Sequence, residues 1–92
     1  MTTVERDDAH HRYNAVINGT VAGVAHYRVR DGKIIFYHTV VEPEFEGKGV
    51  GTELAKGVLD DVRARGEHVT LECPFLAAYV KRHPEYADLV NA

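Results

Sequence analysis

Residues 40–52, with the sequence VVEPEFEGKGVGT, constrain the fold more than any other part of the chain. A β-branched run ends at Val41, Pro43 stops the strand, and three alternating glycines lead into a helix with one apolar face. The first turn of such a helix leaves backbone N–H groups unpaired at the positive end of the helix dipole. Glycines let a ligand approach these groups without meeting a Cβ atom. The stretch therefore predicts a site for an anion such as phosphate; the alternative is a purely structural turn.

The spacing of the glycines excludes two common nucleotide sites. Gly47, Gly49 and Gly51 alternate, whereas a dinucleotide-binding turn has the pattern G-x-G-x-x-G and a Walker A loop has G-x-x-x-x-G-K-[ST]. Neither pattern occurs in the chain. The loop by itself does not identify its phosphate-bearing ligand.

Composition limits the classes of protein that fit. The chain has 92 residues, 45% of them hydrophobic and 27% charged, and we expect residues 1–92 to form a single domain. The net charge of −3 argues against a nucleic-acid partner. No apolar run approaches the ~20 residues of a membrane span and no apolar signal segment follows Met1, so we expect a cytoplasmic protein with no membrane partner. Cys73 is the only cysteine, and we expect no metal site.

The first half of the chain reads as β-structure. Residues 1–9 are polar and acidic, and we expect them to be frayed. Alternating apolar residues predict strands at 12–17, 20–30 and 33–41, joined by two-residue turns at Asn18-Gly19 and Asp31-Gly32. One face of the 20–30 strand should carry Val21, Gly23, Ala25, Tyr27 and Val29. The 33–41 strand carries apolar residues at both its odd-numbered and its even-numbered positions, so we expect it to be central and covered on both faces.

The second half reads as helix, strand and helix. Apolar residues at helical spacing predict a helix from Val50 through Val62, capped by Gly66. Residues 68–71 form a short strand, and Pro74 fits the first position of a second helix that ends near His83. The apolar stripe of that helix would be Phe75, Leu76, Tyr79 and Val80. Because a crossover helix joins parallel strands, the expected fold class is α/β (α+β), a mixed antiparallel-then-parallel sheet with packed helices.

Several motifs together resemble one known family. Residues 46–51 (EGKGVG) look like motif A, Q/R-x-x-G-x-G/A, of the GNAT acetyltransferases. With His38-Thr39, Cys73-Pro74-Phe75 and the run at 83–86 (HPEY), the chain is similar over nearly its whole length to the small, minimal GNAT-like family. The resemblance implies the minimal GNAT (acyl-CoA N-acyltransferase) fold and acetyl-CoA as the cofactor, with its pyrophosphate on motif A. Glu46 departs from the motif, where Gln or Arg is usual, and its carboxylate adds no attraction for phosphate.

The resemblance also implies which residues contact the cofactor. The pantetheine arm would pair with main chain near Val40 and Val41, in the gap where the two parallel strands splay apart. The pyrophosphate would lie on the glycine loop and the first helical turn. The expected cofactor-binding residues are Val40, Val41, Gly47, Lys48, Gly49, Val50, Gly51 and Thr52. For Lys48 the alternative is an exposed lysine that meets no ligand.

Cys73 and His38 are the catalytic candidates. Cys73 precedes the second helix, where the dipole stabilises a thiolate, and His38 lies on the adjacent strand, so the two could face each other across the cleft. Either His38 removes a proton from an attacking amine, or Cys73, activated by His38, accepts the acetyl group first. The alternatives without catalysis are a buried, inert Cys73 and a His38 enclosed in the central strand.

The expected function is N-acetyltransferase activity, with acetyl passing from acetyl-CoA to a primary amine. A protein lysine, a polyamine and a small metabolite all remain open as the acceptor. The alternatives are a CoA-binding regulatory module without catalysis and a small interaction domain. The sequence leaves the oligomeric state open and is compatible with a monomer.

Overall fold

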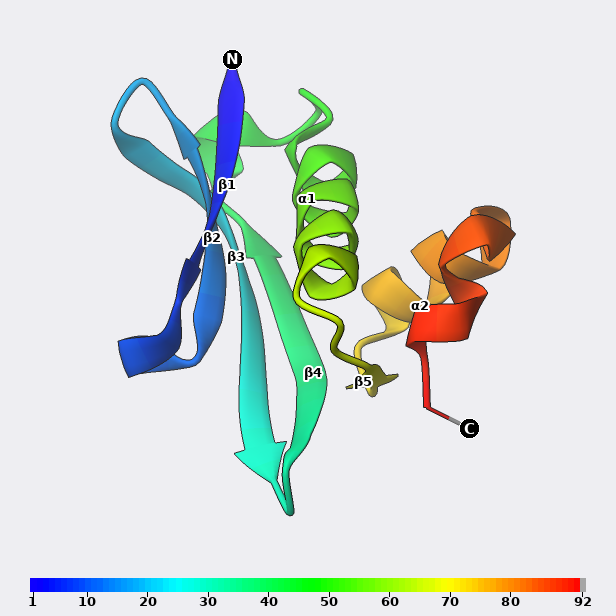
Figure 1. The fold of residues 1–92 in the computed structure, drawn as a ribbon. Helices are drawn as coiled ribbons and strands as arrows, with labels where there is room; N and C mark the ends of the chain where they lie inside the picture. The colour runs from blue at the N-terminus through cyan, green and yellow to red at the C-terminus, as the bar shows by residue number, and fades with distance from the viewer. Residues whose placement is uncertain (92) are drawn as a thin grey trace.

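The computed structural model describes residues 1–91, which form a five-stranded sheet with helices packed against it (Figure 1). The strands are β1 (Thr2–Asp7), β2 (Arg12–Ile17), β3 (Thr20–Arg30), β4 (Lys33–Val41) and β5 (Val69–Leu71), in the spatial order β1-β2-β3-β4-β5. The helices are α1 (Val50–Ala64) and α2 (Pro74–Arg82), with short 3-10 turns η1 (Asp8–His10), η2 (Pro43–Phe45) and η3 (Pro84–Leu89). β1 to β4 are antiparallel and β5 pairs with β4 in parallel, which confirms the expected mixed sheet.

The N-terminus is ordered, so the expectation of a frayed segment at residues 1–9 is wrong. β1 pairs with β2 from Thr2↔Ile17 to Asp7↔Arg12 and forms one edge of the sheet. Val4 packs against the core from this strand. The sequence conceals β1 because its next inward position is taken by a charged residue, Arg6, rather than an apolar one.

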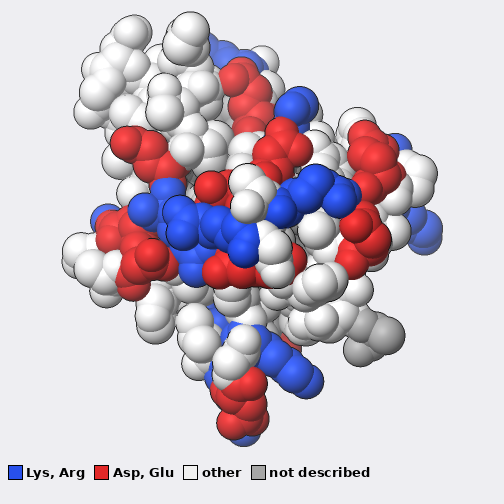
Figure 2. Space-filling model, viewed as in Figure 1, with Lys and Arg blue, Asp and Glu red and all other residues white. Residues whose placement is uncertain are grey.

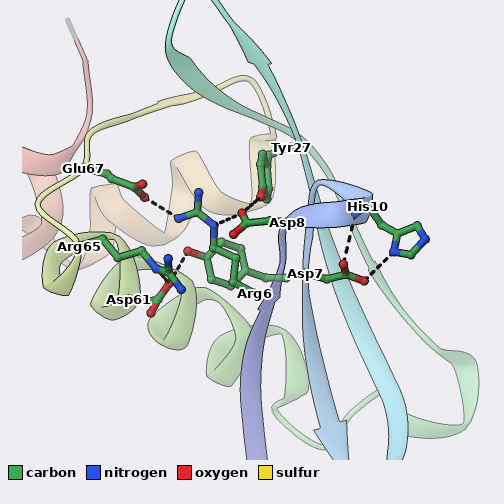
Figure 3. Close-up of polar contacts among 9 residues, drawn as sticks. Arg6, Asp7, Asp8, His10, Tyr27, Asp61, Arg65 and Glu67 are labelled. Atoms are coloured by element: carbon green, nitrogen blue, oxygen red, sulfur yellow. Dashed lines mark hydrogen bonds and ion pairs between the residues drawn. The ribbon is translucent and has the colours of Figure 1, made fainter.

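Arg6 is held by rings and carboxylates between the sheet and α1 (Figure 3). Its side chain is 10% exposed, and its Nη1 donates to Glu67 Oε1 at 2.6 Å and its Nε to Asp8 Oδ1 at 2.7 Å. The guanidinium carbon lies 5.8 Å from the ring centroid of Tyr13 and 5.5 Å from that of Tyr27, within cation–π range. Burial disfavours the charge, but the bonds to Glu67 and Asp8 outweigh it and raise the pKa of Arg6.

The core lies between one face of the sheet and the helices. All six apolar residues expected on the inner face of α1 are buried, namely Val50, Leu54, Ala55, Val58, Leu59 and Val62. Figure 1 shows α1 and α2 on the same side of the sheet, so the expectation that β4 is covered on both faces is wrong. The opposite face, which we call the open face, carries no helix. β4 is nonetheless central, between β3 and β5.

Two β-bulges change the alternation expected from the sequence. In β3, Val21 pairs with Val16 and Gly23 with Ala15, which leaves Ala22 as the extra residue. Ala22 is fully buried and Val21 is 40% exposed, so Val21 is not on the core face as expected. Val29 is also exposed, near the tip of the β3–β4 hairpin.

The second bulge lies in β4 and matters more for function. Tyr27 pairs with Phe36 but His26 pairs with His38, so Tyr37 is the extra residue. Beyond the bulge, odd-numbered and even-numbered residues of β4 exchange the faces of the sheet to which they point. Thr39 follows Phe36 on the helix side and is partly buried, whereas His38 is exposed. The alternative of a His38 enclosed in the central strand is therefore wrong.

The ends of both helices agree with the sequence signals. Gly49 is the N-cap of α1 with φ of 77°, and Gly66 follows its C-terminus with φ of 69°. Pro74 begins α2 and His83 caps its end. Phe75 differs from the expected buried stripe, since it is 38% exposed. None of the described helices is long and apolar enough to cross a membrane.

Candidate functional site

The glycine loop, residues 46–51, opens onto a surface pocket of about 340 Å³ at the N-terminus of α1. The pocket is lined by Val41, Phe45, Glu46, Gly47, Gly49, Val50, Gly51, Thr52 and Phe75. Gly47 and Gly49 have positive φ, and a Cβ at either would meet no atom within 4 Å. The main chain of the loop is therefore directly accessible from the pocket.

The N-terminus of α1 offers unpaired hydrogen-bond donors to this pocket. The first helical bond runs from Glu53 N to Gly49 O at 3.1 Å, so the N–H groups of Val50, Gly51 and Thr52 have no partner of this type. No side chain caps them at Gly49. Together with the dipole of α1, these donors favour an anion at this end of the helix.

The charged residues of the loop are placed differently from one another. Glu46 is one of the residues that line the pocket. Lys48 does not line it; its Nζ lies 5.8 Å from the ring centroid of Phe45. Phe45 itself lines the pocket, so the ammonium of Lys48 lies beside a lining residue, and its role as a phosphate ligand stays a prediction.

Gly51 serves a different purpose from the other two glycines. Its φ is not positive, and a Cβ there would lie 2.9 Å from Cζ of Phe75. The ring of Phe75 thus lies directly over the first turn of α1 and forms one wall of the pocket. The sequence placed Phe75 in the core stripe of α2 and gave no signal for this position.

β4 and β5 separate beside the pocket. The pairing of β5 with β4 is limited to Ile34–Phe36. The next two residues, Glu72 and Cys73, both donate their N–H groups to Phe36 O, at 2.8 and 3.1 Å. The chain then turns into α2. Along β4 from 37 to 41, the edge on the β5 side has no strand partner among the described residues.

The backbone groups on this free edge are those of Thr39 and Val41. Glu42 N donates to Ala22 O at 2.8 Å, which makes Val40 a hydrogen-bonded partner of Val24 on β3. The intervening residues then direct their main-chain N–H and C=O groups away from β3, toward the gap. Of the two expected contacts, Val41 faces the gap, Val40 does not, and Thr39 takes its place.

Cys73 contacts Thr39 rather than His38. The thiol is 3% exposed, and its Sγ lies 3.2 Å from Thr39 Oγ1. Cys73 is also the N-cap of α2, with no side-chain bond to the helix. The expectation that His38 and Cys73 face each other is not met, because the bulge at Tyr37 turns Thr39 toward the thiol instead. No sequence pattern marks that bulge.

His38 lies on the open face of the sheet. Its ring stacks beside that of His26 on β3, with centroids 6.2 Å apart and planes inclined by 14°. His38 and Cys73 therefore border the same gap from opposite faces of the sheet. The structure gathers Val41, Gly47, Gly49, Val50, Gly51 and Thr52 around one pocket, while Val40, Lys48, His38 and Cys73 lie outside its lining.

Comparison with solved structures agrees with this fold. The solution structure of a GCN5-like protein from Staphylococcus aureus matches with a TM-score of 0.70, covering 98% of this chain and 88% of that chain. The two sequences are 22% identical, so this likeness concerns the fold. No curated protein sequence matches the chain.

Comparison with family models is more specific. The model described as GCN5-related N-acetyltransferase matches residues 12–89, which include the glycine loop, the free edge of β4, Cys73 and His38. The chain therefore belongs to the GCN5-related N-acetyltransferase family.

Proposed function

We propose that this protein transfers an acetyl group from acetyl-CoA to a primary amine. The observation that carries the proposal is the meeting of two unpaired backbone surfaces, the first turn of α1 and the free edge of β4. The pyrophosphate of CoA would bind the first turn of α1, and the amides of its pantetheine arm would bind the free edge of β4. The two are adjacent, because Val41 and Gly49 line the same pocket.

The residues present fit this ligand. The N–H groups of Val50, Gly51 and Thr52 would hold the pyrophosphate, and the open space beside Gly47 and Gly49 admits it. The main chain of Thr39 and Val41 would hold the pantetheine amides, as one strand holds another. When bound, acetyl-CoA supplies an activated acyl group at the gap between β4 and β5.

His38 would act as the general base for the amine. A primary amine must lose one proton as it forms an amide, and an exposed imidazole can accept that proton. His38 lies on the open face, so the acceptor amine would approach from that face. Cys73 is nearly inaccessible at 3% exposure, so we favour direct transfer to the amine over a Cys73 adduct.

Binding can be tested with a matched pair of glycine variants. Gly49 and Gly19 share φ of 77° and open surroundings, but Gly19 lies in the β2–β3 turn. Gly49→Ala and Gly19→Ala therefore introduce the same backbone strain. We expect only Gly49→Ala to weaken CoA binding by calorimetry, by about tenfold, or about 1.4 kcal/mol. Equal affinity in both variants and the wild type would reject the binding site.

Turnover can be tested with acetyl-CoA and a panel of a polyamine, free lysine and a lysine peptide. CoA release should require an amine and should fall strongly in His38→Gln. Cys73→Ala should retain most of the activity under direct transfer. Mass spectrometry that finds acetyl on Cys73, with loss of turnover in Cys73→Ala, would instead support the covalent route.

The second candidate is a CoA-binding module without catalysis. It is favoured by Glu46, an acidic residue in the lining of the pocket that would hold the pyrophosphate. Tight CoA binding without turnover of any amine would support this candidate. Glu46→Gln should raise CoA affinity under either function, since it removes the repulsion.

A further inference from the structure

A row of polar side chains crosses the open face of the sheet and ends at His38. The strand registers pair Asp7 with Arg12, Arg12 with His26, and His26 with His38. These four residues therefore lie side by side on β1, β2, β3 and β4. Because directly paired residues in antiparallel strands project to the same face, they form one continuous row.

We propose that His26 is a positioning residue for His38, which holds the His38 ring beside the gap and controls its protonation. This inference rests on the proposed function, in which His38 accepts the proton of the amine. His26 would contact neither substrate nor acetyl group; it would act only through His38.

The geometry around His26 fixes both rings. The rings of His26 and His38 are nearly parallel, and the Tyr37 ring lies 6.2 Å from His26 at an angle of 29°. The β4 bulge makes this possible, because it brings Tyr37 and His38 to one face in succession. His26 is thus in contact range of both residues, and its replacement would free the His38 ring.

Charged side chains flank the two rings on both sides. Arg12 is the next member of the row, and its Nε lies 3.6 Å from Asp7 Oδ2, an oxygen that also contacts His10 Nδ1 at 2.9 Å. On the other side, the guanidinium of Arg28 lies 5.4 Å from the Tyr37 ring centroid.

The Arg28 charge is partly offset, since its Nη2 donates to Glu72 Oε1 at 2.7 Å. The pKa of His26 is lowered by burial first, and then by the charges of His38 and Arg12. His26 is therefore neutral near pH 7, and the pair resists a second proton.

The two histidines would therefore have different roles: His38 accepts the proton and His26 stays neutral beside it. A neutral His26 adds no fixed charge, so His38 can accept a proton. A permanent cation in place of His26 would oppose that proton. At about 6 Å in a water-like dielectric, one unit charge is expected to lower the pKa of His38 by about half a pH unit.

The test compares His26→Lys with Val29→Lys, which adds the same charge to an exposed site on the same strand. His26→Phe retains the ring and controls for packing. Histidine side-chain NMR, with His38 assigned through His38→Gln, follows the His38 titration without any substrate. We expect a lower His38 pKa in His26→Lys only, and an equal downward shift in the acidic limb of kcat/KM.

Each outcome decides the inference. Equal His38 titration in His26→Lys and Val29→Lys would overturn it, as would a shifted titration with an unchanged acidic limb. An inactive wild-type enzyme would reject the proposed function, while the titration would still show whether His26 controls His38.

Discussion

Gly57 in α1 is a site where a normally stabilising substitution should destabilise the protein. Glycine inside a helix costs about 1 kcal/mol relative to alanine, so Gly57→Ala would ordinarily be favourable. Here a Cβ at Gly57 would lie 2.5 Å from Cγ2 and 2.6 Å from Cβ of Val4 on β1. Carbon atoms prefer separations of about 3.5–4.0 Å, so β1 would have to move by about 1 Å.

The expected magnitude follows from these two opposing effects. Overpacking of this kind costs about 1–3 kcal/mol, against the gain of about 1 kcal/mol in helix propensity. We expect Gly57→Ala to lower the free energy of unfolding by up to about 2 kcal/mol in urea titration. Rotation of Val4 cannot relieve the clash, because its Cβ is fixed to the backbone of β1.

Second-site variants test this reasoning directly. Val4→Gly removes both clashing atoms, whereas Val4→Ala leaves the Cβ contact. The double mutant Val4→Gly/Gly57→Ala should therefore show a favourable coupling of about 1 kcal/mol or more, and Val4→Ala/Gly57→Ala much less. If Gly57→Ala is more stable than the wild type by about 1 kcal/mol, or both second-site variants rescue equally, the packing argument is refuted.

Two further predictions concern the Arg6 cluster. Arg6→Met keeps an unbranched apolar stem but removes the guanidinium and leaves Glu67 and Asp8 without their cation, so we expect a loss of about 2 kcal/mol by urea unfolding. A change below about 0.5 kcal/mol would contradict this. Tyr27→Phe removes the bond from the Tyr27 hydroxyl, the largest cause of the lowered pKa of Asp8. Because a carboxyl with a lowered folded-state pKa stabilises the fold above its unfolded pKa of about 3.9, the Phe variant should be less stable at pH 7, with the deficit shrinking as pH falls below about 3.9. Thermal melts from pH 2 to 7 measure this, and a deficit independent of pH would contradict it.

The backbone geometry of the glycine loop could be predicted because its determinants are local. The positive φ of Gly47 and Gly49 and the unpaired N–H groups of α1 arise within a few residues of chain. The same holds for the cap at Gly66 and the start of α2 at Pro74. Each of these features depends on backbone freedom or on bonds between residues three or four apart, which sequence alone specifies.

The faces of the catalytic candidates could not be predicted in the same way. A bulge exists only in the pairing of two strands, and neither Ala22 nor Tyr37 carries a residue type that marks one. Strict alternation of side chains along β4 would therefore put His38 on the wrong face of the sheet. For the same reason, the sequence did not predict the contact of Thr39 with Cys73 or the stacking of His38 on His26.

The N-terminal strand shows a second limit of sequence patterns. β1 is partly buried at Thr2, Val4 and Arg6 and exposed at Thr3 and Glu5, a period of two that is visible in hindsight. An inward arginine is tolerated because Glu67, Asp8 and two tyrosine rings surround it (Figure 3). Of these, Asp8 is local, whereas Glu67 and Tyr27 come from distant parts of the chain. On the face seen in Figure 2, acidic and basic side chains are likewise interspersed.

By itself, the sequence determined the order of most elements, the helix ends and the glycine loop at the start of α1, because backbone freedom and near-neighbour hydrogen bonds decide these. Only the tertiary structure decided that β1 joins the sheet, that Thr39 meets Cys73, and that His38 stands on the open face beside His26. These depend on strand register and on partners far apart in the chain. The glycine loop is thus determined within one segment of chain, whereas the arrangement around His38 depends on the pairing of β1, β2, β3 and β4.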